Sequence, residues 1–189
     1  MRVIAGALRG RALRAPTGTD TRPTSDRVRE SLFSVLGDLH GARVLDLFAG
    51  TGALAIEAIS RGAVHAVCVE SSRHCLPVLR ANVTSLALDA QVLIVARKVG
   101  ECGKTIAKHA PFNLVFADPP WAMVSSGELS RELRPLIADE AYFEVDCRFV
   151  IEHAARDAAP KVDGLVEGET RRWGDTAVTF FSRAHREEA

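Results

Sequence analysis

The residues with the clearest chemical potential are the consecutive Asp118, Pro119, Pro120 and Trp121. The Asp118 carboxylate and the Pro119 carbonyl can each accept one N–H of an exocyclic amine, and the two prolines stiffen the turn. Such an amine is a weak nucleophile because its lone pair is delocalised into the ring. Two hydrogen bonds at the nitrogen favour pyramidalisation and direct the lone pair outward. Trp121 adds a flat face for stacking a base, worth roughly 1–3 kcal/mol. The four residues are therefore a candidate site for a target amine, although a strand-end turn with a core aromatic would also fit.

A second group, residues 46–52, runs from a hydrophobic strand into a glycine-rich turn that precedes a helix. Glycine at positions 50 and 52 lets the backbone approach a ligand closely, and strand carboxyl ends form the usual ligand crevice of such sheets. Glu70 ends the next predicted strand, where its carboxylate can accept hydrogen bonds from both ribose hydroxyls of a nucleoside. Asp46 can orient the turn and meet an ammonium group. We therefore predict S-adenosylmethionine (SAM) as cofactor, with S-adenosylhomocysteine (SAH) as product. The predicted cofactor-binding residues in these two segments are Asp46, Phe48, Gly50, Gly52 and Glu70.

The same turn also fits a dinucleotide site. Residues 50–55 match the pattern G-x-G-x-x-A, and Glu70 lies at a suitable distance for an NAD ribose. Two features favour SAM. An acidic residue at position 46 does not help to bind a pyrophosphate, and the 118–121 element has no role in hydride transfer. Methyl transfer by in-line displacement depends on positioning, needs no metal, and leaves a developing positive charge that Asp118 can stabilise.

The elements that must position these residues follow an alternating pattern after Gly41. Strands and helices that alternate predict an α/β fold with a parallel sheet covered by helices on both faces. Near the C-terminus, residues 165–172 and 176–182 predict an antiparallel pair that closes the sheet edge, and Trp173 between them is interpreted as structural. The other predicted strands are 44–48, 66–69, 91–96, 112–117 and 148–152, and the predicted helices of this region are 53–61 and 73–87.

Charge and hydrophobic pattern divide the chain unevenly. The net charge of the 189 residues is zero, yet residues 1–22 carry +4. We expect an N-terminal extension over residues 1–40 (a basic hairpin arm and a helix), a catalytic domain over 41–183 and a tail over 184–189. A basic arm on a near-neutral body indicates contact with nucleic-acid phosphates, although a solvated surface strand is the simpler alternative. The predicted RNA-binding residues are Arg2, Arg9, Arg11, Arg14 and Arg22.

The cysteines and the hydrophobic runs indicate a cytoplasmic protein. None of Cys68, Cys75, Cys102 and Cys147 has C-x-x-C spacing, so we interpret them as reduced thiols rather than zinc ligands. The N-terminus has no apolar core of signal-peptide length. No apolar run approaches the roughly 18 residues that cross a bilayer, so we expect no membrane association.

Several segments resemble one enzyme family. Residues 118–121 resemble the Asp/Asn-Pro-Pro-aromatic signature of amino-group N-methyltransferases. Residues 22–33 (RPTSDRVRESLF), the opening residues 2–6 (RVIAG) and 8–11 (LRGR), and residues 172–176 (RWGDT) are narrower matches. Together they resemble the bacterial 16S rRNA guanine-N2 methyltransferases of the RsmD family, over essentially the whole chain.

The resemblance implies a Rossmann-like methyltransferase fold with a seven-stranded, mostly parallel sheet. It implies N2 methylation of a single guanine, guanine 966, in the rRNA of the small ribosomal subunit, within an assembled particle. It also places Thr24 at the methionine end of SAM. The sequence leaves the oligomeric state open, and a monomer is the default expectation. Two features depart from the family pattern. The signature aromatic is Trp121, and the run Arg97-Lys98-Val99 after the third predicted strand offers no acidic residue to the adenine N6.

Other functions remain open on the sequence alone. An adenine-N6 DNA methyltransferase uses a similar signature, but such enzymes need a sizeable target-recognition region. Only about 26 residues separate Trp121 from the fifth predicted strand. A protein-glutamine methyltransferase typically has Asn at the first signature position, where this chain has Asp118. A non-catalytic RNA-binding or NAD-binding protein has no need of the intact 118–121 element.

Overall fold

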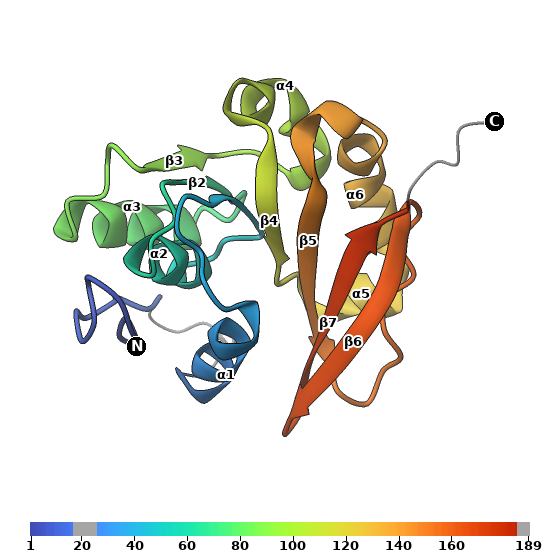
Figure 1. Ribbon diagram of the computed structural model, residues 1–189, viewed down its shortest axis with the longest axis horizontal. Coiled ribbons are helices and arrows are strands. Elements are labelled where there is room, and N and C mark those ends of the chain that lie inside the picture. Colours follow the sequence, from blue (N-terminus) through green and yellow to red (C-terminus); the bar gives the residue numbers. More distant parts are fainter. Residues whose placement is uncertain (17–25, 185–189) are drawn as a thin grey trace.

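The computed structural model describes residues 1–16 and 26–184. One seven-stranded sheet runs through it in the order β3-β2-β1-β4-β5-β7-β6 (Figure 1). β1 to β5 are parallel, whereas β7 is antiparallel to β5 and β6 is antiparallel to β7. The predicted seven-stranded, mostly parallel α/β fold is therefore confirmed. The strands are β1 Arg43–Leu47, β2 His65–Val69, β3 Val92–Val95, β4 Phe112–Ala117, β5 Phe143–Ala154, β6 Leu165–Trp173 and β7 Thr176–Arg183.

The strand order reverses between β1 and β4. From β1 the chain proceeds outward through β2 to β3, and then returns to place β4 on the other side of β1. The connections that follow β1 and β4 therefore diverge, which opens a crevice at the carboxyl ends of these two strands. Residues 46–52 and 118–121 lie at these two strand ends.

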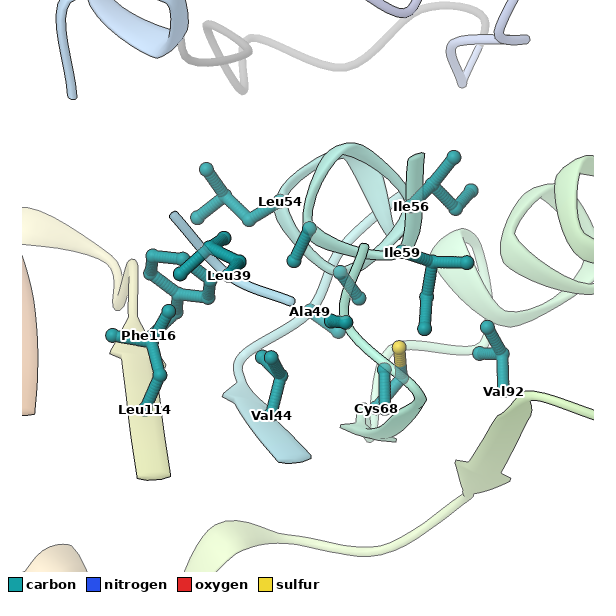
Figure 2. Packing of buried hydrophobic residues seen from close by; sticks show 14 of the residues in the cluster. Leu39, Val44, Ala49, Leu54, Ile56, Ile59, Cys68, Val92, Leu114 and Phe116 are labelled. Carbon is teal, nitrogen blue, oxygen red and sulfur yellow. The ribbon is translucent and has the colours of Figure 1, made fainter. Parts of the chain in front are cut away.

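Strand alternation builds a hydrophobic core on each face of the sheet. On one face, Val44, Phe116 and Val150 belong to a cluster with α2 (Ala53–Ser60) and α1 (Asp26–Leu36). Figure 2 shows Leu54, Ile56 and Ile59 of α2 above the strand residues of this cluster. Their neighbours in the strands point to the other face, where they pack with α6 (Glu128–Ile137) and α4 (Gly103–Ile106). Every residue of α2 except Ala53 is buried, as its apolar sequence requires.

The N-terminal arm folds back on itself and packs on α2. Its two limbs share an isolated antiparallel bridge between Arg2 and Ala12, and backbone hydrogen bonds join Val3 N to Arg11 O and Leu13 N to Met1 O. Glu57 of α2 accepts hydrogen bonds from the backbone N–H groups of Ile4 and Ala5, at 2.7 and 3.0 Å. Gly6 has φ +80°, and a Cβ there would lie 1.7 Å from the Ser60 carbonyl oxygen. The absence of a side chain at position 6 is therefore what lets the arm approach the helix.

Three features of the chain differ from the predicted elements. α3 begins at Cys75 and ends at Ser85, so Pro77 lies in its first turn, where no N–H is needed. β5 is 12 residues long, well beyond the predicted 148–152. The segment after Trp121 forms two helices that sequence reasoning did not identify, α5 (Trp121–Ser125) and α6. α6 contains Pro135 and buries Leu129, Leu133, Leu136 and Ile137.

The four cysteines are free thiols, and all except Cys75 are buried. No helix within residues 1–16 and 26–184 combines the length and apolar character that a membrane crossing needs.

Candidate active site

A cleft with a volume of about 1330 Å³ lies at the carboxyl ends of β1, β2, β4 and β5. The turn between β6 and β7 forms a further part of its wall. The cleft brings together the two segments singled out in the sequence, although they are about 70 residues apart. The predicted site residues that line it are Asp46, Phe48, Gly50, Glu70, Asp118, Pro119, Pro120 and Trp121. Thr24 and Arg22 lie outside the described residues.

The two predicted glycines of the turn have different surroundings. Gly50 has φ +55° and lines the cleft, and no atom lies closer than 4.0 Å to the place of a Cβ. Gly52 has φ +79°, is buried and does not line the cleft. A Cβ there would lie 2.4 Å from Cδ1 of Leu79 on α3. Gly50 can therefore admit a ligand, whereas Gly52 permits close packing of the turn against α3.

Asp46 is a buried carboxylate beneath the glycine turn. Asp46 is only 1% exposed, and its Oδ2 accepts a hydrogen bond from Ala55 N at 3.1 Å. Its pKa is raised to about 8, mainly by burial and also by the nearby charges of Asp118 and Glu70, against the opposing hydrogen bond from Ala55. Three carboxylates thus converge on one region of the cleft. A cationic ligand placed there would relieve both the burial cost and the mutual repulsion, which fits the ammonium and sulfonium groups of SAM.

Glu70 links the glycine turn to the loop that follows β2. Its Oε2 accepts a hydrogen bond from Gly50 N at 2.7 Å, and its Oε1 accepts from Ser71 N and Ser72 N at 2.7 and 2.6 Å. A carboxylate offers about four acceptor positions. Glu70 therefore shapes the backbone on both sides of the cleft and has limited capacity left for ribose hydroxyls unless these bonds rearrange.

Asn82 was not identified from the sequence, yet it connects the arm to the cofactor turn. This fully buried α3 residue donates from Nδ2 to the carbonyl of Thr51 at 2.9 Å. It also accepts from Arg14 N at 2.8 Å and donates to Arg14 O at 3.2 Å. The only signal in the sequence is a polar residue among the apolar positions of a helix, which does not reveal its partners.

A second, smaller cleft of about 140 Å³ adjoins the first and shares Phe48, Glu70, Ser71 and Met123 with it. Arg97, Lys98 and Val99 form one side. Glu128 and Glu132 of α6 form another, and Glu132 accepts a hydrogen bond from Gly100 N at 2.9 Å. Two acidic side chains of α6 thus face the segment after β3, which carries none at residues 97–99. Sequence reasoning could not find them because the helix itself was not predicted.

The target end of the cleft contains the 118–121 element and two groups that sequence reasoning did not assign to it. Pro119 is buried, and Trp121, the first residue of α5, is half-buried. Trp173 packs partly against the core, as a structural residue would, and it also lines the cleft. Glu152 of β5 is 8% exposed and lines the same space.

The described arginines of the arm, Arg2, Arg9, Arg11 and Arg14, are all exposed. Met1 and Pro16 of the arm line the cleft, so the arginine-bearing segment lies beside it. The arm is anchored by Arg29, a fully buried cation of α1 whose Nη2 donates to Arg2 O and to Asp26 Oδ1, at 2.7 and 2.8 Å. Burial lowers the pKa of Arg29 against the attraction of Asp26 and Glu57.

Comparison with known proteins extends these observations. The family model described as "Conserved hypothetical protein 95" matches residues 1–182. The chain is 34% identical to YlbH of Bacillus subtilis over 186 residues, which cover 97% of this chain and 99% of that protein. It is 33% identical to "Ribosomal RNA small subunit methyltransferase D" of Escherichia coli over 163 residues, covering 86% of this chain and 79% of that one.

Solved structures show the same architecture. The yhhF protein of Escherichia coli superposes with a TM-score of 0.79 at 32% identity, covering 97% of each chain. A hypothetical protein of a Thermus species gives a TM-score of 0.78 at 31% identity, covering 95% of this chain and 98% of the other. The family model, these relatives and the shared fold agree with the resemblance found in the sequence. The chain therefore belongs to the Conserved hypothetical protein 95 family, the RsmD family of methyltransferases.

Proposed function

We propose that this protein transfers a methyl group from SAM to the exocyclic N2 amine of a guanine in 16S rRNA of the small ribosomal subunit. One observation carries the proposal. The Asp118-to-Trp121 element and the glycine turn with Asp46 and Glu70 line the same cleft. A base amine and a nucleoside cofactor can therefore meet within it. The name of the Escherichia coli relative, "Ribosomal RNA small subunit methyltransferase D", supports rRNA as the substrate class.

The cofactor half of the cleft would hold SAM with its charged end toward Asp46. Gly50 leaves room for the ligand, and Glu70 would bind the ribose hydroxyls after giving up part of its backbone contacts. Phe48 and the smaller cleft beside it would receive the adenine. Thr24 is proposed at the methionine end on the resemblance alone. SAM would supply a methyl group on a positively charged sulfur. The protein would position the base and stabilise the charge that develops on its amine.

The target half would position the base. Asp118 and the carbonyl of Pro119 would each accept one N–H of the amine, with the base stacked against Trp121. This arrangement directs the nitrogen lone pair toward the methyl carbon. Asp118 would stabilise the positive charge that develops on the nitrogen as it receives the methyl group from the sulfonium, which would leave as the neutral thioether of SAH. Asp118 would also pass the excess proton from the nitrogen to solvent. A base that is paired or stacked in the RNA must first be flipped outward.

The target nucleotide and its context rest on the family resemblance. It points to guanine 966 within an assembled small subunit. A cytoplasmic location follows from the cysteine pattern, and a monomer is the default expectation. Exposed Arg2, Arg9, Arg11 and Arg14 beside the cleft support an extended contact with RNA phosphates, since such contacts position a substrate without reading its sequence. Arg22 is proposed in the same role.

The rival assignment as an adenine-N6 DNA methyltransferase finds less support. The segment after Trp121 forms α5 and α6, and α6 buries its apolar face in the same core as β4 and β5. This part of the chain is therefore committed to the catalytic domain and adds no separate target-recognition unit.

Labelled methyl transfer tests the proposal. Small subunits from cells that lack the enzyme, naked 16S rRNA and duplex DNA would each be incubated with the protein and labelled SAM, and the products digested to nucleosides. The proposal expects N2-methylguanosine at a single position, formed best in subunits. Methyladenine in DNA, or stabilisation of the protein by NAD but not by SAH, would contradict it.

A further inference from the structure

Glu152 stands directly beside the target-amine site. In the parallel pairing of β4 with β5, Ala117 is opposite Ile151, so Asp118, which directly follows β4, and Glu152 of β5 are the next positions along the two chains. Phe116 and Val150, two residues earlier on each strand, belong to the same hydrophobic cluster. Strand alternation therefore points Asp118 and Glu152 toward the same face. Both residues line the large cleft.

Glu152 is a carboxylate at a position of β5 where its apolar neighbours would lead one to expect an apolar residue. It lies within β5, opposite the fully buried Val178 of β7, and is only 8% exposed. Val150 on the same face is a core residue. Glu152 therefore places a largely buried carboxylate at the border of the space proposed for the target base.

The chemistry of the guanine edge matches two adjacent acceptors. Guanine carries the N2 amine and the N1–H donor next to each other, whereas adenine has an unprotonated N1 that only accepts. Neighbouring strands lie about 4.8 Å apart, so groups on β4 and β5 can reach adjacent atoms of one base. With the amine held by Asp118 and Pro119, the neighbouring donor faces β5.

We propose that Glu152 determines base specificity by accepting the N1–H of the target guanine, an inference that rests on the proposed function. A base with the amine but without the N1–H meets a carboxylate opposite a lone pair and is rejected. Sites built to hydrogen-bond a substrate donor discriminate strongly against analogues that lack it, because a buried polar group is then left unpaired.

The test uses a base that separates the two donors. 2-Aminopurine keeps the 2-amino group, but its N1 is an acceptor. Small subunits would be reconstituted with 16S rRNA carrying guanine or 2-aminopurine at the nucleotide that the wild-type protein methylates. Methyl transfer to each would be measured for the wild type and for Glu152→Gln. Glu144→Gln, on the same strand but away from the cleft, is the matched control.

The wild type and the Glu144→Gln control should prefer guanine by about 100-fold or more in kcat/KM. Glu152→Gln should lose activity on guanine and gain it on 2-aminopurine, because its amide N–H can donate to N1. The preference should fall by at least about tenfold, with SAH affinity and thermal stability unchanged. An unchanged preference, or equal losses on both bases, would overturn the assignment of Glu152 alone. Failure of the wild type to methylate guanine N2 at all would overturn the proposed function, and this inference with it.

Discussion

The two halves of the cleft are built in different ways. Most of the cofactor half comes from one stretch of chain, residues 46–82. Within it, Asp46 and Glu70 accept hydrogen bonds from backbone N–H groups, and Asn82 donates one to a backbone carbonyl. The target half is assembled from three segments that are distant in sequence, residues 118–121, 152–156 and 172–176. The first half is prepared by local contacts. The second depends on the pairing of β4, β5 and β7 to bring its parts together.

This difference predicts that changes in the two halves affect different measurements. Damage to the cofactor half should alter SAM or SAH affinity, together with the stability of the turns around it. Damage to the target half should alter transfer while cofactor affinity is retained. The following variants test this separation, beginning with the largest expected effect.

Asp118→Ala should give the largest effect and the clearest separation. Removal of the carboxylate takes away one acceptor of the target amine and the charge that stabilises it during transfer. We expect kcat to fall by about 10³-fold or more, with SAH affinity within a few-fold of the wild type by calorimetry. Joint loss of SAH binding and transfer would show that the 118–121 turn supports both halves of the cleft. It would contradict the prediction that the two halves can be changed separately.

Asp46→Asn should change the pH dependence of the unfolding free energy, and it should separately weaken cofactor binding. The pKa of Asp46 is raised from 3.8 to about 8 in the folded protein. Above pH 4 the carboxylate ionises in the unfolded chain but stays protonated in the folded one. The contribution of the Asp46 carboxyl to the free energy of unfolding is therefore greatest below about pH 4, and it falls as the pH rises toward 8. Asparagine removes this dependence and keeps an oxygen for Ala55 N.

Chemical denaturation at pH 4, 6 and 8 measures that effect without ligand. We expect Asp46→Asn to match the wild type near pH 4 and to exceed its unfolding free energy by about 1–3 kcal/mol at pH 8. SAH binding should be weaker in the variant at every pH. A constant difference in stability across the range would mean that Asp46 does not titrate as its burial requires.

The sequence reveals the two halves to different degrees for the same structural reason. Asp46, Gly50 and Glu70 were predicted because a strand, a turn and the next strand end follow one another along the chain. The 118–121 element was identified because its four residues are consecutive. Glu152 and Trp173 were not assigned to the site, because their positions beside the cleft depend on strand pairing that no local pattern encodes.

The failure to predict α6 has a similar cause. Pro135 within α6 and the charged residues around it weakened the helical pattern of residues 128–137, so the helix was not predicted. Its buried leucines become informative only once the opposite face of the sheet is known. The strength of the strand predictions came instead from buried apolar runs such as 112–117, which match β4 at both ends.

Glu70→Ala should have a moderate effect, confined to the cofactor half. The variant loses the proposed ribose contacts and also frees the N–H groups of Gly50, Ser71 and Ser72. We expect SAM binding to weaken by about 1–3 kcal/mol, with much of the transfer rate restored at saturating SAM. Glu70→Gln keeps one acceptor oxygen and should lie between the wild type and the alanine variant. An unchanged dissociation constant would remove Glu70 from the cofactor site.

The smallest effect per residue is expected for the basic arm, which touches neither reacting group. Arg9, Arg11 and Arg14 are exposed on a segment fixed to α2 and α3, and Arg11 also donates to Ser85 O at 3.1 Å. Their replacement by alanine removes proposed phosphate contacts. KM for subunits should rise, and the slope of log affinity against log salt should flatten by about 0.7–0.9 for each phosphate that is no longer neutralised. SAH affinity and kcat at saturating substrate should change little.

A matched control keeps this prediction specific to the arm. Arg134 is also exposed, but it lies on α6, which packs on the opposite face of the sheet, where it pairs with Asp163 at 2.8 Å. Arg134→Ala should therefore leave both KM and the salt slope unchanged. If the triple variant of the arm behaves like this control, the arm serves only to cover α2, and the RNA footprint lies elsewhere around the cleft. If its SAH affinity falls as well, the link through Asn82 from Arg14 to Thr51 transmits the change to the cofactor turn, and the two halves are coupled rather than separate.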